Sequence, residues 1–116
     1  MKLKVCGLSN PIEVETCVNN NVDFCGFILN YIKSHRYISY ERAKDILTID
    51  KKKVQYVGVL VKPTFEELEK FSKLNLDYFQ LYGQYNNKSL AEIKNKFKKK
   101  IISSIQVKNQ NDIESY

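Results

Sequence analysis

Short apolar runs alternate along this chain with longer segments of mixed polarity. Strict alternation at the start predicts a strand over residues 2–6. Further apolar runs predict strands over residues 23–29, 55–61, 78–82 and 101–107. Between them, apolar side chains recur at helical spacing over 11–19 and around Ala43 and Ile46, Leu68 and Phe71, and Leu90 and Ile93. The pattern therefore alternates strand and helix throughout.

Polar residues that can cap helices stand where the helical segments begin. Caps are predicted at Asn10, at Ser39 after a long polar loop, and at Thr64. Glu13 and Glu67 each follow a cap by three residues, which is the position of the acid in a capping box. These signals place the starts of the first three helices.

Repeated strand and helix units predict an α/β fold with a parallel sheet and right-handed crossovers. No Gly/Ser-rich stretch divides the chain, so residues 1–116 are expected to form a single domain. An eight-stranded (βα) barrel needs about 250 residues. The chain therefore suits an incomplete barrel of about five of the eight (βα) units, truncated after the start of a fifth helix near 109–116. The alternative is an open five-stranded parallel sheet.

The positive charge of the chain comes almost wholly from lysine. Seventeen lysines and two arginines, against thirteen acidic residues, give a formal net charge of +6. The lysine runs at 51–53 and 98–100 lie between a predicted helix and the next strand, where cations favour the helix end. We expect solvated turns there, with an acidic partner as the alternative. Nucleic acid is not expected as a partner, because no basic stripe is interleaved with aromatic residues.

Cysteine usage and apolar run length exclude several classes of protein. Three cysteines are an odd number without metal-ligand spacing, and His35 is the single histidine, so no metal site is expected. The four glycines form no phosphate loop, and no cofactor is expected. No apolar run approaches the ~20 residues of a membrane span, so no membrane contact and a cytoplasmic location are predicted. Cys17 and Cys25 lie at apolar positions and are expected to pack in the core.

Cys6 is the strongest candidate for chemistry. In a strand of period two, Leu3 and Val5 face one side while Lys4 and Cys6 share the other. Gly7 follows at once and relaxes the backbone. Parallel α/β proteins carry their chemistry where a strand ends and a helix is about to begin. The sequence therefore predicts an exposed thiol at a functional edge of the sheet.

Several motifs occur in an order that resembles one enzyme family. The blocks are K-V-C-G-L-S-N at 4–10, D-F-C-G-F-I at 23–28, K-S-H-R-Y-I-S at 33–39, V-G-V-L-V at 57–61 and Q-L-Y-G at 80–83. Together they resemble the phosphoribosylanthranilate isomerases of tryptophan biosynthesis, which are TIM barrels. The resemblance covers essentially all 116 residues.

The resemblance implies an Amadori rearrangement of N-(5-phosphoribosyl)anthranilate, a small sugar phosphate. It makes Cys6 the general base and Arg36 the residue that holds the anthranilate carboxylate; a planar guanidinium can grip a carboxylate through two parallel bonds. Gln80 and Tyr82 share a strand face and either line the pocket or pack within the barrel. Tyr82 stands where the family has histidine.

Lys4 is the candidate for tuning the Cys6 thiol. A nearby cation lowers the pKa of a thiol and raises its thiolate fraction, which a base requires. The alternative is that Lys4 pairs with a carboxylate inside the sheet.

The resemblance also implies machinery that this sequence does not contain. A general-acid aspartate on a sixth strand and phosphate-binding backbone after the seventh and eighth would lie beyond Tyr116. We therefore expect the isolated chain to be inactive. Exposed edges at the first and fifth strands predict self-association or pairing with the missing barrel portion. The competing interpretation is a non-catalytic α/β binding or interaction module.

Overall fold

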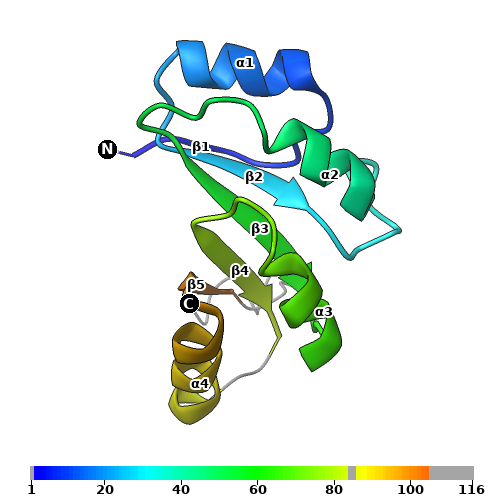
Figure 1. The fold of residues 1–116 in the computed structure, drawn as a ribbon, viewed down its shortest axis with the longest axis vertical. Coiled ribbons are helices and arrows are strands. Elements are labelled where there is room, and N and C mark those ends of the chain that lie inside the picture. Colours follow the sequence, from blue (N-terminus) through cyan, green and yellow to red (C-terminus); the bar gives the residue numbers. More distant parts are fainter. Residues whose placement is uncertain (1, 84–85, 105–116) are drawn as a thin grey trace, which may run out of the picture.

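A computed structural model describes residues 2–83 and 86–104. One parallel sheet runs through the molecule in the order β1-β2-β3-β4-β5 (Figure 1). The strands are β1 (Lys4–Val5), β2 (Phe24–Ile28), β3 (Gln55–Val61), β4 (Tyr78–Tyr82) and β5 (Lys100–Ser104). The helices are α1 (Pro11–Asn19), α2 (Tyr40–Ile46), α3 (Phe65–Phe71) and α4 (Asn87–Phe97). The predicted alternation of strand and helix is confirmed.

The two outer strands differ from their predicted bounds. β1 covers two residues instead of the predicted 2–6, because it lies at an edge and has only β2 to pair with. Backbone hydrogen bonds before and after β1 still hold the chain beside β2. The Asp23 N–H donates to the Leu3 carbonyl, and the Gly7 N–H donates to the Gly26 carbonyl. β5 begins one residue early, and residues 105–107 and 109–116 lie outside the described part.

The predicted caps are confirmed. The side chains of Asn10, Ser39 and Thr64 accept hydrogen bonds from the backbone of the first turn at 2.9, 3.2 and 3.1 Å. Glu67 completes a capping box with Thr64. Glu13 differs, since its carboxylate accepts chiefly from the backbone N–H of Ser9, one residue before the cap. The Glu13 carboxylate also lies 3.4 Å from the Arg36 guanidinium.

The helices cover one face of the sheet, as Figure 1 shows. Alternate strand residues pack against them in a single apolar core, including Cys25, Phe27, Tyr56, Leu60, Phe79 and Leu81. Parallel strands in sequential order, with all helices on one face, are typical of a (βα) barrel. In open doubly wound sheets the strand order reverses, and helices cover both faces. β1 and β5 do not pair with each other, so the sheet is an incomplete barrel.

The lysine-rich turns are only partly solvated, which corrects the expectation from sequence. Lys51 pairs with Asp77 at 2.9 Å, and that carboxylate also accepts from the backbone N–H of Tyr56 at 2.8 Å. Lys99 donates to the Leu74 and Leu76 carbonyls at 3.3 and 2.8 Å. Burial lowers the pKa of Lys99, because desolvation penalises its charged form. These lysines tie together the end of the sheet at which β4 and β5 begin.

Candidate active site

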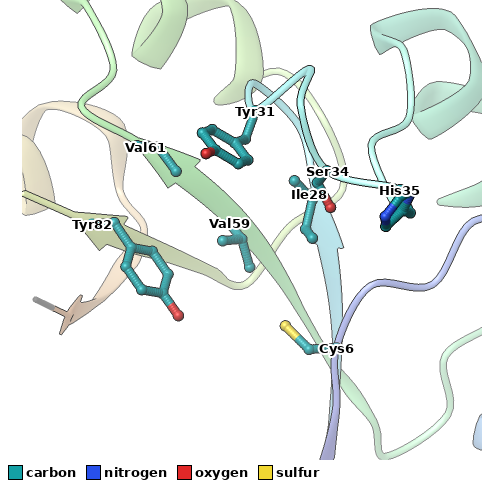
Figure 2. A pocket seen from close by; sticks show the side chains of 8 residues that line it. All are labelled: Cys6, Ile28, Tyr31, Ser34, His35, Val59, Val61 and Tyr82. Atoms are coloured by element: carbon teal, nitrogen blue, oxygen red, sulfur yellow. The ribbon is translucent and has the colours of Figure 1, made fainter. Parts of the chain in front are cut away.

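A pocket of about 320 Å³ opens at the carboxyl ends of β1 to β4. Its lining residues are Cys6, Ile28, Tyr31, Ser34, His35, Val59, Val61 and Tyr82. Figure 2 shows the Cys6 sulfur, directly after β1, and the Tyr82 hydroxyl, at the end of β4, extending into it with Val59 between them. The volume lies within the range of small-molecule sites, which are concave and mostly apolar.

The backbone around Cys6 presents its thiol to the pocket. Gly7 adopts φ 79°, and the N–H groups of Gly7 and Leu8 both donate to the Gly26 carbonyl, so the chain turns sharply after the thiol. A Cβ added at Gly26 would lie 2.8 Å from the Cys6 sulfur. Gly26 therefore leaves the space that the thiol occupies. Cys6 is exposed, as the sequence predicts.

The other two thiols lie on the helix side of the sheet. Cys25 is fully buried, and Cys17 packs half-buried against the same core. Burial raises the pKa of the Cys25 thiol to about 12, and the neighbouring Cys17 adds to the effect. Their predicted role as packing residues is confirmed, and Cys6 is the only exposed cysteine.

Lys4 shares the pocket face with Cys6. A Cβ added at Gly26 would lie 3.3 Å from the Lys4 Cε, and the Cys6 sulfur approaches the same position. Its ammonium donates to the side-chain carbonyl of Gln80, whose amide nitrogen donates to the Tyr82 hydroxyl at 3.1 Å. Within residues 2–83 and 86–104, the partner of the Lys4 ammonium is thus the neutral amide of Gln80 and not a carboxylate. Gln80 is only 7% exposed and lies below the pocket, whereas Tyr82 lines it.

Arg36 lies beside the pocket and is not among its lining residues. Its side chain covers Gly7, where an added Cβ would come within 3.0 Å of the Arg36 Cγ. One guanidinium nitrogen lies 3.4 Å from a carboxylate oxygen of Glu13, and the arginine side chain is 58% exposed. A hydrogen bond from the Ser9 backbone lowers the pKa of Glu13, and Arg36 contributes to that shift. Glu13 therefore stays ionised and holds the guanidinium near the pocket mouth.

The sequence did not single out the other lining residues. Ile28, Val59 and Val61 occupy alternate positions near the ends of their strands, so they share one face of the sheet, and period-two spacing is a signal that could have found them. Tyr31 and Ser34 come from the loop after β2. That loop folds back because Ile38 donates to the Ile28 carbonyl, a contact that no local pattern predicts.

The pocket combines the Cys6 thiol, the phenols of Tyr31 and Tyr82, the Ser34 hydroxyl and the His35 imidazole with an apolar wall. None of its lining residues is an aspartate or glutamate. Within residues 2–83 and 86–104, no group of three or more metal-binding side chains occurs, and no helix of the same part is long and apolar enough to cross a membrane. The described residues thus offer a thiol and hydrogen-bonding groups for a small molecule, and no carboxylate lines the pocket.

Comparison with known proteins connects this geometry to a family. A sequence profile described as N-(5'-phosphoribosyl)anthranilate (PRA) isomerase matches residues 3–116. The chain belongs to the phosphoribosylanthranilate isomerase family. The N-(5'-phosphoribosyl)anthranilate isomerase of Streptococcus mutans is 35% identical over 108 residues, which cover 92% of this chain and 53% of that protein. The corresponding protein of Listeria monocytogenes serotype 4b (strain F2365) is 36% identical over 109 residues, 93% of this chain and 51% of that protein.

Solved phosphoribosylanthranilate isomerases share the fold. A crystal structure of one in complex with reduced 1-(o-carboxyphenylamino)-1-deoxyribulose 5-phosphate has a TM-score of 0.82 and 31% identity, covering 99% of this chain and 58% of that one. The Thermotoga maritima isomerase gives the same TM-score and identity, with 55% of its chain covered. The family assignment from the sequence blocks is confirmed. The chain spans about half the length of the curated relatives it matches.

Proposed function

We propose that the protein to which this chain contributes converts N-(5-phosphoribosyl)anthranilate to 1-(2-carboxyphenylamino)-1-deoxyribulose 5-phosphate, a step of tryptophan biosynthesis. The observation that carries the proposal is the exposed Cys6 thiol, at the end of the first strand, opening into a pocket of small-molecule size in a chain of this family.

Cys6 is proposed as the general base of this isomerisation. An acid protonates the ring oxygen, the bond from C1 to that oxygen breaks, and the nitrogen lone pair forms an iminium. The Cys6 thiolate then removes the C2 proton, the C–H electrons form a C1–C2 double bond, and the iminium electrons return to nitrogen. The resulting enolamine takes a proton at C1 and loses one from the C2 hydroxyl, which yields the keto sugar. A positioned base contributes about 10²- to 10⁴-fold to such a step.

Arg36 is proposed to bind the anthranilate carboxylate at the pocket mouth. Its guanidinium is exposed, and one nitrogen is already held by Glu13 at 3.4 Å. A guanidinium offers five N–H donors, so the contact with Glu13 leaves others for a second carboxylate. Tyr82 is proposed to contact the sugar portion deeper in the pocket, with Gln80 acting behind it.

The general acid is proposed to come from sequence that this chain does not include. The pocket lacks an acidic lining residue, and the relatives extend well beyond the matched region. We therefore propose that the 116 residues alone do not turn over substrate and that the open sheet pairs with the remainder of a barrel. A base that must be a free thiol suits a reducing compartment, which supports a cytoplasmic location.

The test joins this chain to the carboxyl-terminal part of the Streptococcus mutans relative, giving a product called here the completed chain. We expect isomerase turnover from the completed chain and none from the 116 residues alone. Cys6→Ala should lower turnover of the completed chain by about 10²- to 10⁴-fold. Cys17→Ala, which removes a thiol from the far side of the sheet, is the matched control and should retain turnover.

Two results would contradict the proposal. Full turnover in the Cys6→Ala completed chain would remove the thiol from the chemistry. Turnover by the isolated 116 residues, lost in Cys6→Ala, would instead show that the acid lies within this chain.

A further inference from the structure

A chain of hydrogen bonds runs beneath the pocket and links two strands that are not neighbours. Lys4 lies on β1, whereas Gln80 and Tyr82 lie on β4, so the lysine side chain spans the concave face above β2 and β3. Gln80 is the middle member and is buried. The ammonium of Lys4, half-buried itself, thus meets a neutral amide and lies below the pocket.

The chemistry of the three groups decides the direction of each bond. A lysine ammonium has three donors and no acceptor, so the Gln80 side chain must turn its carbonyl oxygen toward Lys4. Its NH₂ group must then face Tyr82 and donate to the hydroxyl oxygen. A phenol carries one hydroxyl proton, and this link does not use it. The proton of Tyr82 therefore points away from Gln80, and Tyr82 lines the pocket.

We propose that Lys4 is a positioning residue, which acts through Gln80 to make the Tyr82 hydroxyl a hydrogen-bond donor to an oxygen of the bound sugar phosphate. The identity of that ligand rests on the proposed function; the direction of the bond does not. Tyr82 stands where the family has histidine. Lys4, acting through Gln80, makes the Tyr82 hydroxyl a hydrogen-bond donor toward the pocket.

The position of the positive charge suits the same ligand. Lys4 bonds to the neutral amide of Gln80, and neither of the two ion pairs found within residues 2–83 and 86–104 involves Lys4. A cation beneath an apolar pocket raises the local potential and favours an anionic ligand. A phosphate-bearing sugar has that charge.

The first experiment reverses the bond with Gln80→Glu, a change of nearly equal shape. A carboxylate only accepts, so it accepts from Lys4 and from the Tyr82 hydroxyl together, which turns the Tyr82 proton away from the pocket. The C–O stretching band of a tyrosine lies at higher wavenumber when its hydroxyl donates than when it accepts. We therefore expect the Tyr82 band, identified by difference against Tyr82→Phe, to rise in the Gln80→Glu chain.

Lys4→Met supplies a second variant in case Gln80→Glu fails to fold. It removes the ammonium to which the Gln80 carbonyl is bonded, so the Tyr82 band should broaden or split as the amide gains a second orientation. Lys44→Met, on the exposed face of α2, is the control and should leave the band unchanged. A Tyr82 band that stays in place in both Lys4→Met and Gln80→Glu would overturn the proposed direction of the link.

The second experiment measures binding to the completed chain, with reduced 1-(o-carboxyphenylamino)-1-deoxyribulose 5-phosphate as the probe. Loss of one donated hydrogen bond should weaken binding about fivefold in Tyr82→Phe. Gln80→Glu should weaken it at least as much, and the double variant should not add the two losses, because both remove one bond. Unchanged affinity in Tyr82→Phe would overturn the contact with the ligand.

The two experiments separate this inference from the function on which it rests. If the Tyr82 band responds as expected but the completed chain binds no probe and shows no turnover, the proposed function fails while the direction of the link stands. If turnover depends on Cys6 but the band does not respond, the function stands and the role of Lys4 fails.

Discussion

Gly26 shows how one missing side chain shapes the pocket. It lies in the middle of β2, and a Cβ there would come within 3.4 Å or less of Cys6 and Lys4 atoms. The glycine therefore gives space to both side chains on the concave face. Gly58 does the same on the helix face, where Leu76 and Leu29 approach within 3.0 Å or less. The two glycines differ in which side of the sheet they leave open.

Gly26→Ala should displace the Cys6 thiol. The new methyl group would lie 2.8 Å from its sulfur, so we expect a changed alkylation rate at Cys6 and a loss of about 1–3 kcal/mol in the free energy of unfolding. Gly58→Ala is the matched control: its clash with Leu76, at 2.7 Å, should cost similar stability and leave Cys6 alkylation unchanged. Equal alkylation rates at Cys6 in all three proteins would contradict this account.

Glu13 should make stability depend on pH in the acid range. Its pKa in the folded chain is lowered from the usual value of a glutamate, chiefly by the Ser9 backbone bond and also by Arg36. Its contribution to the free energy of unfolding is therefore present above the pKa of Glu13 in the unfolded chain. That contribution is lost as pH falls through its pKa in the folded chain. Because Glu13 is largely solvated, we expect Glu13→Gln to lower the free energy of unfolding at pH 7 by at most about 1 kcal/mol.

The measurement is chemical denaturation of the wild-type and Glu13→Gln chains between neutral and acid pH. The difference between their free energies of unfolding should shrink as pH falls. Glu15→Gln removes an exposed carboxylate from the same helix and should have no effect at pH 7. A constant difference between the wild-type and Glu13→Gln chains down to the most acid pH would show that the charge of Glu13 is irrelevant.

At the scale of elements, the loop after β2 carries much of the site and needs an anchor. Asn30 supplies it, because its side-chain amide pairs with the backbone of Val61 like an extra strand residue. Its oxygen accepts from the Val61 N–H at 2.7 Å and its nitrogen donates to the Val61 carbonyl at 3.0 Å. The loop that holds Tyr31, Ser34 and Arg36 is thereby fixed to the end of β3.

Asn30→Asp should loosen that anchor. The carboxylate keeps the bond from the Val61 N–H but faces the Val61 carbonyl without a donor, and Glu67 lies nearby. A lost hydrogen bond to a part-buried carbonyl costs about 1–3 kcal/mol. We expect faster hydrogen exchange at the Ile38 amide, which joins the loop to β2, whereas Asn95→Asp on the exposed face of α4 should leave it unchanged. Identical exchange in all three chains would exclude an anchoring role.

At the scale of the whole molecule, the sheet has two edges. β1 and β5 each pair with one neighbour, so backbone donors and acceptors on their outer sides lack a strand partner within the described sheet. Such edges template pairing with other strands. The helices cover only one face of the sheet (Figure 1). The opposite, concave face, which carries Lys4, Gln80 and the pocket, is therefore not covered by helices of the described part.

The isolated 116 residues should associate. Sedimentation velocity should show species that grow with protein concentration, since the open edges of β1 and β5 can pair with strands of another chain. Adding the carboxyl-terminal part of the Streptococcus mutans relative should convert these species to a one-to-one complex. A stable monomer at all concentrations, unaffected by the added part, would indicate a self-sufficient sheet.

Local patterns were sufficient for the elements and for the thiol. Apolar runs along 23–29 and 55–61 predicted two of the strands, and the caps at Asn10 and Thr64 located the helix starts. The sharing of one face by Lys4 and Cys6 follows from period two alone. These features depend on neighbours in sequence, so the sequence could specify them.

Contacts between distant residues were decided only in three dimensions. Lys4 reaches Gln80 across two intervening strands, Glu13 holds Arg36, and Asn30 closes on Val61. None of these pairs is set by local spacing, because each depends on how the sheet curves and how the loop after β2 folds back. The sequence by itself determined an exposed Cys6 at the end of a strand, whereas the tertiary structure decided which groups surround it and in which direction their hydrogen bonds run.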